Sequence, residues 1–255
     1  MGFLAYNGGS IHYESVGSGT PVVLIHGFTF DHRMWRHQVR SLREDFRVVT
    51  YDCRGFGRSS TPVGPYSHHD DLRHLLRHLG IARPHVVGLS MGGRIALNHA
   101  LARPDAPRSL VLIGTDVGGF PFGFDWDAGL AGVSTAAAKA MWLRHGLFDP
   151  VRARPEAWRL VQAMVDGYSG WHWRNGDMRV PADTGALARL AEIRTPVDVA
   201  VGALDLADFH EIAGVLAARI PHARHTVLPG VGHLAPLEDP PAVNALLRRA
   251  FTSCS

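Results

Sequence analysis

The sequence is poor in the residues that mark several whole classes of protein. Only Cys53 and Cys254 are cysteines, and no C-x-x-C pair occurs, so we expect neither a disulfide framework nor a cysteine zinc site. No segment reaches the roughly 18 consecutive apolar residues of a membrane-spanning helix. The N-terminal residues lack a basic segment followed by a long apolar run, so we expect no signal peptide and a cytoplasmic protein.

Lysine is almost absent, since Lys139 is the single lysine among 26 basic residues. The formal net charge is only +3, and the arginines form no dense stripe, so nucleic acid is not an expected partner. A hydrophobic share of 46% and a charged share of 19% are ordinary for a globular protein. We therefore expect a protein with a large core that acts on a small molecule, and the oligomeric state is left open.

Short, continuous apolar runs alternate with helical patterns along most of the chain. Such runs are typical of strands buried on both faces, and they occur at residues 21–27, 46–52, 85–89, 109–115, 197–202 and 223–230. Helical spacing is found at residues 31–44, 68–80, 91–101, around 212–216, and after Asp239-Pro240. Residues 2–6 and 10–16 flank Asn7-Gly8-Gly9 and predict a hairpin. The alternation predicts a mostly parallel sheet with helices on both faces.

The alternation stops between residues 115 and 197, a gap of roughly 80 residues that far exceeds one crossover connection. This stretch has its own helical patterns near residues 128–145, 155–168 and 183–192. It also holds five of the six tryptophans, Trp126, Trp142, Trp158, Trp171 and Trp173. We expect residues 118–191 to form a helical cap inserted after the sixth strand, and residues 1–117 and 192–255 to form the core domain.

The segment HVVGLSMGGRIAL, residues 85–97, places Ser90 between a predicted strand and a predicted helix. A serine hydroxyl becomes a nucleophile only beside a base and fixed hydrogen-bond donors. A sharp strand-to-helix turn can present it, and Gly88 and Gly92 would remove side chains that collide there. The following helix would direct its N–H groups toward the site. We predict that Ser90 is a nucleophile; the alternative is a glycine-rich turn that packs a helix on the sheet.

Five segments together resemble those of a known family: LIHGF (24–28), YDCRGFGRSS (51–60), GLSMGG (88–93), VGALD (201–205) and GVGHLAPLEDP (230–240). The chain is similar to the α/β-hydrolases, in particular to small esterases and enol-lactone hydrolases with an inserted cap. The resemblance runs over nearly the whole chain. It implies an α/β-hydrolase fold in which the serine, the acid and the histidine of a catalytic triad follow in that order.

The resemblance also implies roles for the residues beside these motifs. The residue after the first HG and the residue after the nucleophile supply the oxyanion-hole N–H groups in this family, which here are those of Phe28 and Met91. Asp52, Arg54 and Gly57 match a structural turn of the family, so we expect them to support the scaffold.

His233 is the predicted base among 16 histidines, because it follows a strand and a glycine-rich loop and precedes the last helix. His26 is expected to brace the oxyanion loop. His74 and His78 stand four residues apart and could share a metal, but no third ligand is evident. We therefore expect a solvated helix face there, with no metal and no cofactor.

Three carboxylates compete for the role of the acid that orients the histidine. Asp205 follows the strand 197–202 and is preferred. Asp208 is the first residue of a D-x-x-E pattern that ends at Glu211, which predicts a helix-capping role. Asp116 follows the strand 109–115, at a position that some relatives use.

The expected reaction is hydrolysis of a carboxylic ester or lactone through an acyl-enzyme. Tryptophans of the cap would favour an apolar or aromatic substrate, unless they only form the core of the cap. Four arginines could bind a substrate carboxylate or be solvated, Arg94, Arg144, Arg174 and Arg179. Alternatives are a C–C bond hydrolase, a cofactor-free perhydrolase, and a ligand receptor without turnover. A haloalkane dehalogenase is disfavoured, because its chemistry needs a carboxylate in place of Ser90.

Overall fold

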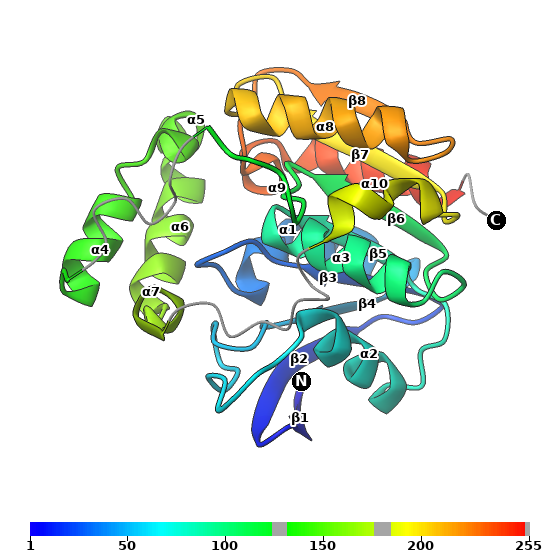
Figure 1. Ribbon diagram of the computed structural model, residues 1–255, viewed down its shortest axis with the longest axis horizontal. Coiled ribbons are helices and arrows are strands. Elements are labelled where there is room, and N and C mark those ends of the chain that lie inside the picture. The colour runs from blue at the N-terminus through cyan, green and yellow to red at the C-terminus, as the bar shows by residue number, and fades with distance from the viewer. Residues whose placement is uncertain (124–131, 176–184, 253–255) are drawn as a thin grey trace.

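A computed structural model describes residues 1–123, 132–175 and 185–252, and its strands form one central sheet (Figure 1). Along the chain these strands are β1 (Gly2–Tyr6), β2 (Gly9–Val16), β3 (Thr20–Ile25), β4 (Phe46–Tyr51), β5 (His85–Leu89), β6 (Ser109–Ile113), β7 (Val197–Gly202) and β8 (Arg224–Leu228). Their spatial order is β1-β2-β4-β3-β5-β6-β7-β8. β2 is antiparallel to β1 and to β4, while all the other neighbouring pairs are parallel. The predicted hairpin and mostly parallel sheet are confirmed.

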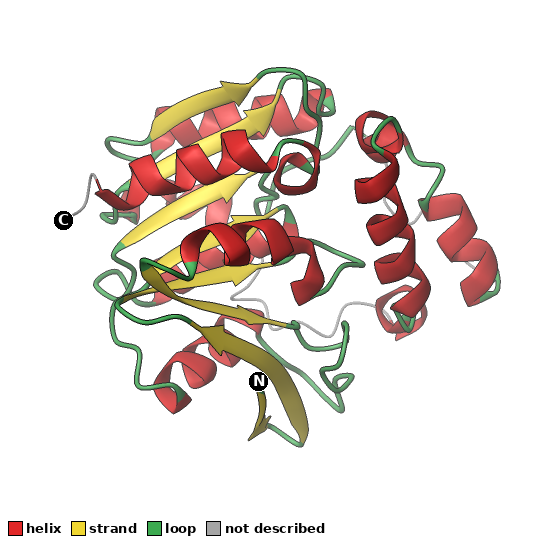
Figure 2. Ribbon diagram, turned by 180° about the vertical axis from the view of Figure 1, so that it is seen from behind, coloured by secondary structure: helices red, strands yellow, loops and turns green. Residues whose placement is uncertain are grey.

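Helices cover both faces of the sheet, which explains why the central strands are apolar on both sides (Figures 1 and 2). One face carries α2 (His68–His78), α3 (Met91–Ala102) and α8 (Ala207–Arg219), and the other carries α1 (Arg36–Leu42) and α10 (Pro240–Thr252). Every residue of β5, β6 and β7 is buried. The edge strand β8 is mostly exposed instead. No described helix is long and apolar enough to cross a membrane.

The start of α10 (Pro240–Thr252) agrees with the sequence pattern, whereas the start of α8 (Ala207–Arg219) differs from it. The side chain of Asp239, the residue before Pro240, accepts a hydrogen bond from the N–H of Ala242 (3.0 Å) and so caps α10, which begins where the sequence predicted a helix. The predicted capping role of Asp208 is wrong. α8 begins at Ala207, and its N-cap residue makes no side-chain cap hydrogen bond. Asp208 lies within the first turn of α8 instead, where the positive end of the helix dipole stabilises a carboxylate.

The predicted helix at residues 31–44 consists of two elements. A 3₁₀ helix, η1 (His32–Trp35), precedes α1. Asp31 caps η1, because its carboxylate accepts the N–H of Arg33 at 3.0 Å. The apolar spacing is compatible with both helix types, so the sequence pattern could not separate them.

Between β6 and β7 in the sequence, a group of short helices stands beyond the carboxyl ends of the parallel strands (Figure 2). We call these the inserted helices: α4 (Thr135–Trp142), η2 (Gly146–Phe148), α5 (Asp149–Arg152), α6 (Pro155–Gly167) and α7 (Trp171–Asn175). η4 (Ala186–Glu192) packs on α3 and α8 of the sheet layer instead. Parts of the predicted helices at 128–145 and 183–192, Trp126 and Arg179 lie outside the described residues. The domain limits at 118 and 191 stay a prediction.

Candidate active site

Ser90 occupies a one-residue turn between β5 and α3 in a strained backbone conformation. Its φ of 53° and ψ of −118° are unfavourable for any residue that has a Cβ. Its N–H donates to the carbonyl of Ile113 in β6 (3.0 Å), and its own carbonyl accepts the N–H of Gly93 (2.9 Å). The turn is therefore tied to both the sheet and the helix, which hold the serine in this conformation.

The glycines around Ser90 allow the helix to start directly against the sheet. A Cβ on Gly88 would collide with the backbone of Gly92. A Cβ on Gly92 would collide with the carbonyl of Ile25 at the end of β3. The expected reason for these glycines is confirmed, and the structure identifies the colliding groups as backbone. Such contacts cannot relax as a flexible side chain could.

Asp205 and His233 form the closest acid and histidine pair of the site. Nδ1 of His233 lies 2.9 Å from Oδ2 and 3.1 Å from Oδ1 of Asp205, with the imidazole 2% and the carboxylate 0% exposed. The N–H of Leu206 also donates to Oδ1 (2.8 Å). Because an ionised carboxylate only accepts, the proton lies on Nδ1 of His233. In the neutral form of the ring, Nε2 keeps its lone pair, as a general base requires.

This pair and Ser90 approach the same end of β6. Gly114 directly follows β6, and a Cβ placed there would lie 3.0 Å from Nδ1 of His233 and 3.1 Å from Oδ2 of Asp205. The residue before it, Ile113, accepts the N–H of Ser90. Within the described chain no hydrogen bond joins the Ser90 hydroxyl to His233. Catalytic hydrogen bonds are often incomplete without substrate and tighten when it binds.

The two predicted oxyanion donors lie on adjoining segments. Gly92 abuts the carbonyls of Ile25 and His26, so the start of α3 at Met91 packs against the loop that contains Phe28. In the described residues neither the Met91 nor the Phe28 N–H donates to a turn or loop carbonyl. Their roles as oxyanion donors stay a proposal.

His26 braces this loop, as expected from the sequence. Its Nδ1 donates to the carbonyl of Gly27 (2.8 Å), and its Nε2 accepts the N–H of Cys53 (2.9 Å). This arrangement needs a neutral imidazole, and complete burial lowers the pKa of His26 accordingly. The loop is thereby fixed to the end of β4.

The competing carboxylates have other partners. Asp116 pairs with Arg94 (2.7 Å), and its N–H donates to the Ser90 carbonyl (3.3 Å). Asp208 accepts the N–H of Gly123 at 3.1 Å. Of the three candidates, Asp205 is the one whose carboxylate contacts His233. The pairing also engages Arg94, one of the arginines considered for substrate binding.

Aromatic rings gather over the oxyanion loop. The ring of Phe28 lies edge-on to those of Phe56 (5.5 Å between centroids), Trp142 (6.0 Å), Tyr168 (5.8 Å) and Trp173 (6.1 Å). Phe28 and Trp173 are only half-buried. A partly open aromatic wall beside the predicted oxyanion hole suits an apolar or aromatic substrate group.

The described tryptophans of this stretch have different ring partners. Trp142 and Trp173 contact the ring of Phe28. Trp158 instead packs on Phe148 within the inserted helices, with centroids 6.2 Å apart. Trp171 contacts Tyr66 at 6.4 Å.

Two more of the arginines considered for substrate binding, Arg144 and Arg174, lie in the described part of the chain. Arg174 donates to the carbonyls of Ser169 (2.9 Å) and Gly170 (3.3 Å) near its own helix. Arg144 is exposed. The hydrogen bonds of Arg174 are therefore local to its own segment.

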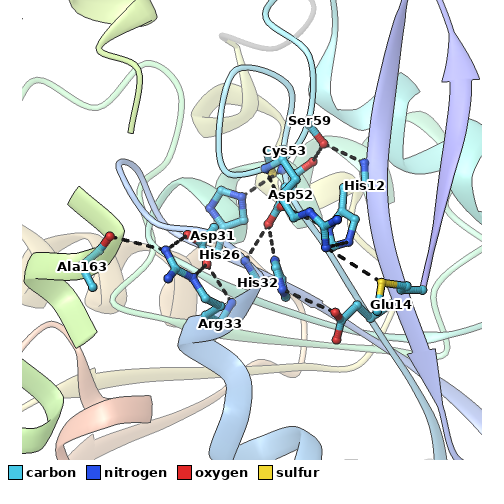
Figure 3. Close-up of polar contacts among 12 residues, drawn as sticks. His12, Glu14, His26, Asp31, His32, Arg33, Asp52, Cys53, Ser59 and Ala163 are labelled. Carbon is cyan, nitrogen blue, oxygen red and sulfur yellow. Dashed lines mark hydrogen bonds and ion pairs between the residues drawn. The ribbon is translucent and has the colours of Figure 1, made fainter. Parts of the chain in front are cut away.

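A second polar cluster surrounds Asp52, which directly follows β4 (Figure 3). Its Oδ1 accepts the N–H (2.8 Å) and Nδ1 (2.7 Å) of His32, and its Oδ2 accepts Nδ1 of His12 (3.1 Å) and the N–H of Arg58 (2.9 Å). These three side chains, His12, His32 and Asp52, are close enough to share a metal. However, four donors already occupy the carboxylate, so the cluster fits a structural network. This agrees with the scaffold role expected for Asp52.

His74 and His78 contact separate partners. The ring of His74 stacks on Tyr6 with centroids 3.8 Å apart. Nε2 of His78 lies 3.1 Å from the hydroxyl of Tyr13.

The predicted scaffold role of Arg54 and Gly57 is also seen. Arg54 pairs with buried Asp71 at 2.7 Å.

Gly57 has φ +52°, and a Cβ there would collide with the Asp52 carboxylate. Sequence reasoning missed two side chains that support the site, Glu238 and Thr29. Glu238 stands five residues after His233 in GVGHLAPLEDP, which was the available signal.

Comparisons with known proteins place this fold in a family. A family model described as alpha/beta hydrolase fold matches residues 20–240. A putative carbamate hydrolase, RutD, of Azorhizobium caulinodans is 37% identical over 106 residues, which are 40% of this chain and 40% of that protein. The matched segment thus covers about two fifths of the length of this curated relative.

Solved structures match over nearly the whole chain. Est816, described as an N-acyl homoserine lactone degrading enzyme, is 29% identical with a TM-score of 0.84, over 97% of this chain and 99% of that one. The enol-lactonase of Burkholderia xenovorans LB400 is 26% identical with a TM-score of 0.84, over 98% of this chain and 100% of that one. Both likenesses extend across the sheet and the inserted helices.

Proposed function

The chain belongs to the alpha/beta hydrolase fold family, and from this premise we propose that it is a serine hydrolase of small carboxylic esters or lactones. The observation that carries the proposal is the arrangement of three residues. Ser90 stands on a strained strand-to-helix turn, and the buried pair of Asp205 and His233 approaches the same end of β6. A nucleophile, an orienting acid and a base, which follow in this order along the chain, are the parts of a serine hydrolase.

The proposed reaction has two stages. His233 takes the proton of Ser90 while the hydroxyl oxygen attacks the substrate carbonyl, and the N–H groups of Phe28 and Met91 stabilise the oxyanion. His233 then protonates the leaving alcohol, and the acyl group stays on Ser90. Water, activated by the same histidine, releases the acid. Each oxyanion donor would lower the barrier by about 2.7–4 kcal/mol.

The proposed substrate carries an apolar or aromatic group beside its ester or lactone bond. The half-buried rings of Phe28 and Trp173 next to the oxyanion loop support this choice. Lactone hydrolysis is in keeping with the two solved structures above, a lactone degrading enzyme and an enol-lactonase. A small-molecule substrate, a cytoplasmic location and a cap formed by the inserted helices are parts of the same proposal.

The decisive experiment gives an answer whichever ester or lactone is the natural substrate. We expect a fluorophosphonate probe to label the wild-type protein on Ser90, and we expect Ser90→Ala to remain unlabelled. p-Nitrophenyl esters of rising chain length, aromatic esters and simple lactones then identify the substrate class. A folded protein that neither reacts with the probe nor turns over any of these compounds would contradict the proposal.

The alternatives make different products in the same assays. A C–C bond hydrolase would cleave ring-cleavage dienones and leave simple esters intact. A perhydrolase would require peroxide, and a receptor would bind without turnover. The carboxylate nucleophile of a dehalogenase is missing at position 90.

A further inference from the structure

The loop that carries His233 is held by a buried carboxylate. Oε2 of Glu238 accepts the N–H of Gly232 (2.8 Å), and Oε1 accepts the N–H of Leu234 (3.0 Å). These are the backbone N–H groups of the two residues on either side of His233, and the Glu238 side chain is completely buried. Both bonds need a group that only accepts, which an ionised carboxylate provides. Glu238 thus restrains the backbone from which the imidazole extends.

A cation from the inserted helices completes this arrangement. Nη1 of Arg154 lies 3.2 Å from Oε2 of Glu238, and Nη2 donates to the carbonyl of Gly230 (2.7 Å). Nη1 also donates to the carbonyl of Pro150 (2.7 Å), on which Gly232 packs. Burial raises the pKa of Glu238, while the two N–H donors and Arg154 oppose that rise. One guanidinium therefore joins the inserted helices to the histidine loop.

The inserted helices hold the oxyanion loop in a similar way. Nε1 of Trp142 donates to the hydroxyl of Thr29 (2.8 Å), and this hydroxyl donates to the carbonyl of Phe28 (2.6 Å). Thr29 is fully buried and has φ +64°. A β-branched residue adopts such a conformation only where its surroundings impose it. Trp142 contributes to these surroundings from α4.

We propose that Arg154, acting through Glu238, and Trp142, acting through Thr29, are positioning residues for catalysis. The two side chains come from one group of helices and reach the two loops that bear the base and an oxyanion donor. The position of the inserted helices therefore determines the geometry of both loops. This inference rests on the proposed serine-hydrolase function.

Two pairs of variants test the proposal. Arg154→Gln and Trp142→Phe remove the hydrogen bonds to the two loops. Arg152→Gln and Trp158→Phe are the matched controls, because Arg152 and Trp158 make their contacts within the inserted helices. We expect kcat to fall roughly 10- to 100-fold in the first pair, as for loss of a charge-assisted or buried hydrogen bond, with KM changing much less. The controls should keep the wild-type kcat.

Hydrogen exchange measured by mass spectrometry supplies a readout besides activity. Arg154→Gln should speed exchange in residues 229–234, and Trp142→Phe should do so in residues 27–30. Arg154→Lys should restore part of kcat, because it keeps the charge but not the forked geometry. It also serves if Arg154→Gln fails to fold. Equal kcat and equal exchange in test and control variants would overturn the proposal.

The failure of the proposed function has a different signature. In that case the wild-type protein would show no Ser90-dependent labelling or turnover, whatever the state of Arg154 and Trp142. If Ser90-dependent turnover is present but insensitive to both test variants, only the positioning role is wrong.

Discussion

Nδ1 of His233 lies 2.9 Å from Oδ2 of Asp205, although 28 residues of sequence separate the two side chains. Asp205 follows β7 and His233 follows β8, so the parallel pairing of these strands brings their carboxyl ends together. The ring of Phe209 in α8 covers the imidazole, with centroids 4.3 Å apart. A buried carboxylate that contacts one ring nitrogen has direct consequences for the proposed reaction.

Asp205→Asn should leave the protein folded and lower kcat/KM by roughly 1,000- to 10,000-fold, because an amide no longer favours the required tautomer of His233. Asp116→Asn is the matched comparison, since Asp116 pairs with Arg94 and not with the histidine. Ester hydrolysis and the melting temperature of both variants check this. A larger loss of kcat/KM in Asp116→Asn than in Asp205→Asn would show that Asp205 is not the acid.

Ser90→Gly should raise the free energy of unfolding by about 1 kcal/mol while abolishing turnover. Glycine adopts the observed φ of 53° without strain, whereas serine is destabilised by it. Ser90→Ala is the control, because it also lacks the hydroxyl but keeps the Cβ. Urea denaturation of the three proteins decides the matter. Equal gains in both variants would show that strain is not the cause.

Gly92→Ala should destabilise the protein by about 2 kcal/mol or more and lower activity, because its Cβ would meet the backbone of Ile25. Gly214→Ala in α8 is the control. A Cβ there has no neighbour within 4 Å, so the change should stabilise the helix by up to about 1 kcal/mol. Thermal unfolding distinguishes the two. A neutral Gly92→Ala would refute the close contact.

The contribution of His32 to stability should depend on pH. Burial opposes its charged form, but the hydrogen bond and charge of Asp52 prevail and raise the pKa of His32. A raised folded-state pKa stabilises the protein below the unfolded value of about 6.5, and this contribution is lost as the pH rises through the folded-state pKa. His32→Asn should therefore destabilise more near pH 5.5 than near pH 9, as measured by urea denaturation. The opposite order would contradict the pairing with Asp52.

Trp173→Ala should weaken the preference for aromatic substrates. Loss of the edge-on contact with Phe28 would raise KM for aromatic esters by roughly 2- to 10-fold, with little change for acetate esters. Trp171→Ala is the control, because Trp171 contacts Tyr66 instead. The ratio of kcat/KM values for the two ester classes gives the answer. An equal change in kcat/KM for both ester classes would show that the Trp173 ring does not contact the substrate.

Much of the fold, and the sharp turn at Ser90, could be predicted from the sequence alone. Apolar runs and helical spacing are local properties, and they identified the hairpin, the six later strands and α3 to within a few residues. The glycines around Ser90 predicted a sharp turn, because only one kind of local geometry requires them so densely. The 3₁₀ start at residues 32–35 and the position of Asp208 inside α8 were not predicted.

Only the tertiary structure shows which carboxylate at the carboxyl edge of the sheet contacts His233. Asp116, Asp205 and Asp208 all stand at or near strand ends, and spacing alone left them in competition. Strand order and loop conformation directed Asp205 to His233 and gave Asp116 to Arg94. The roles of Glu238 and Trp142 arise in the same way, because hydrogen bonds between distant segments depend on packing. Local periodicity specifies elements, whereas the partner of a polar side chain is decided only when those elements meet.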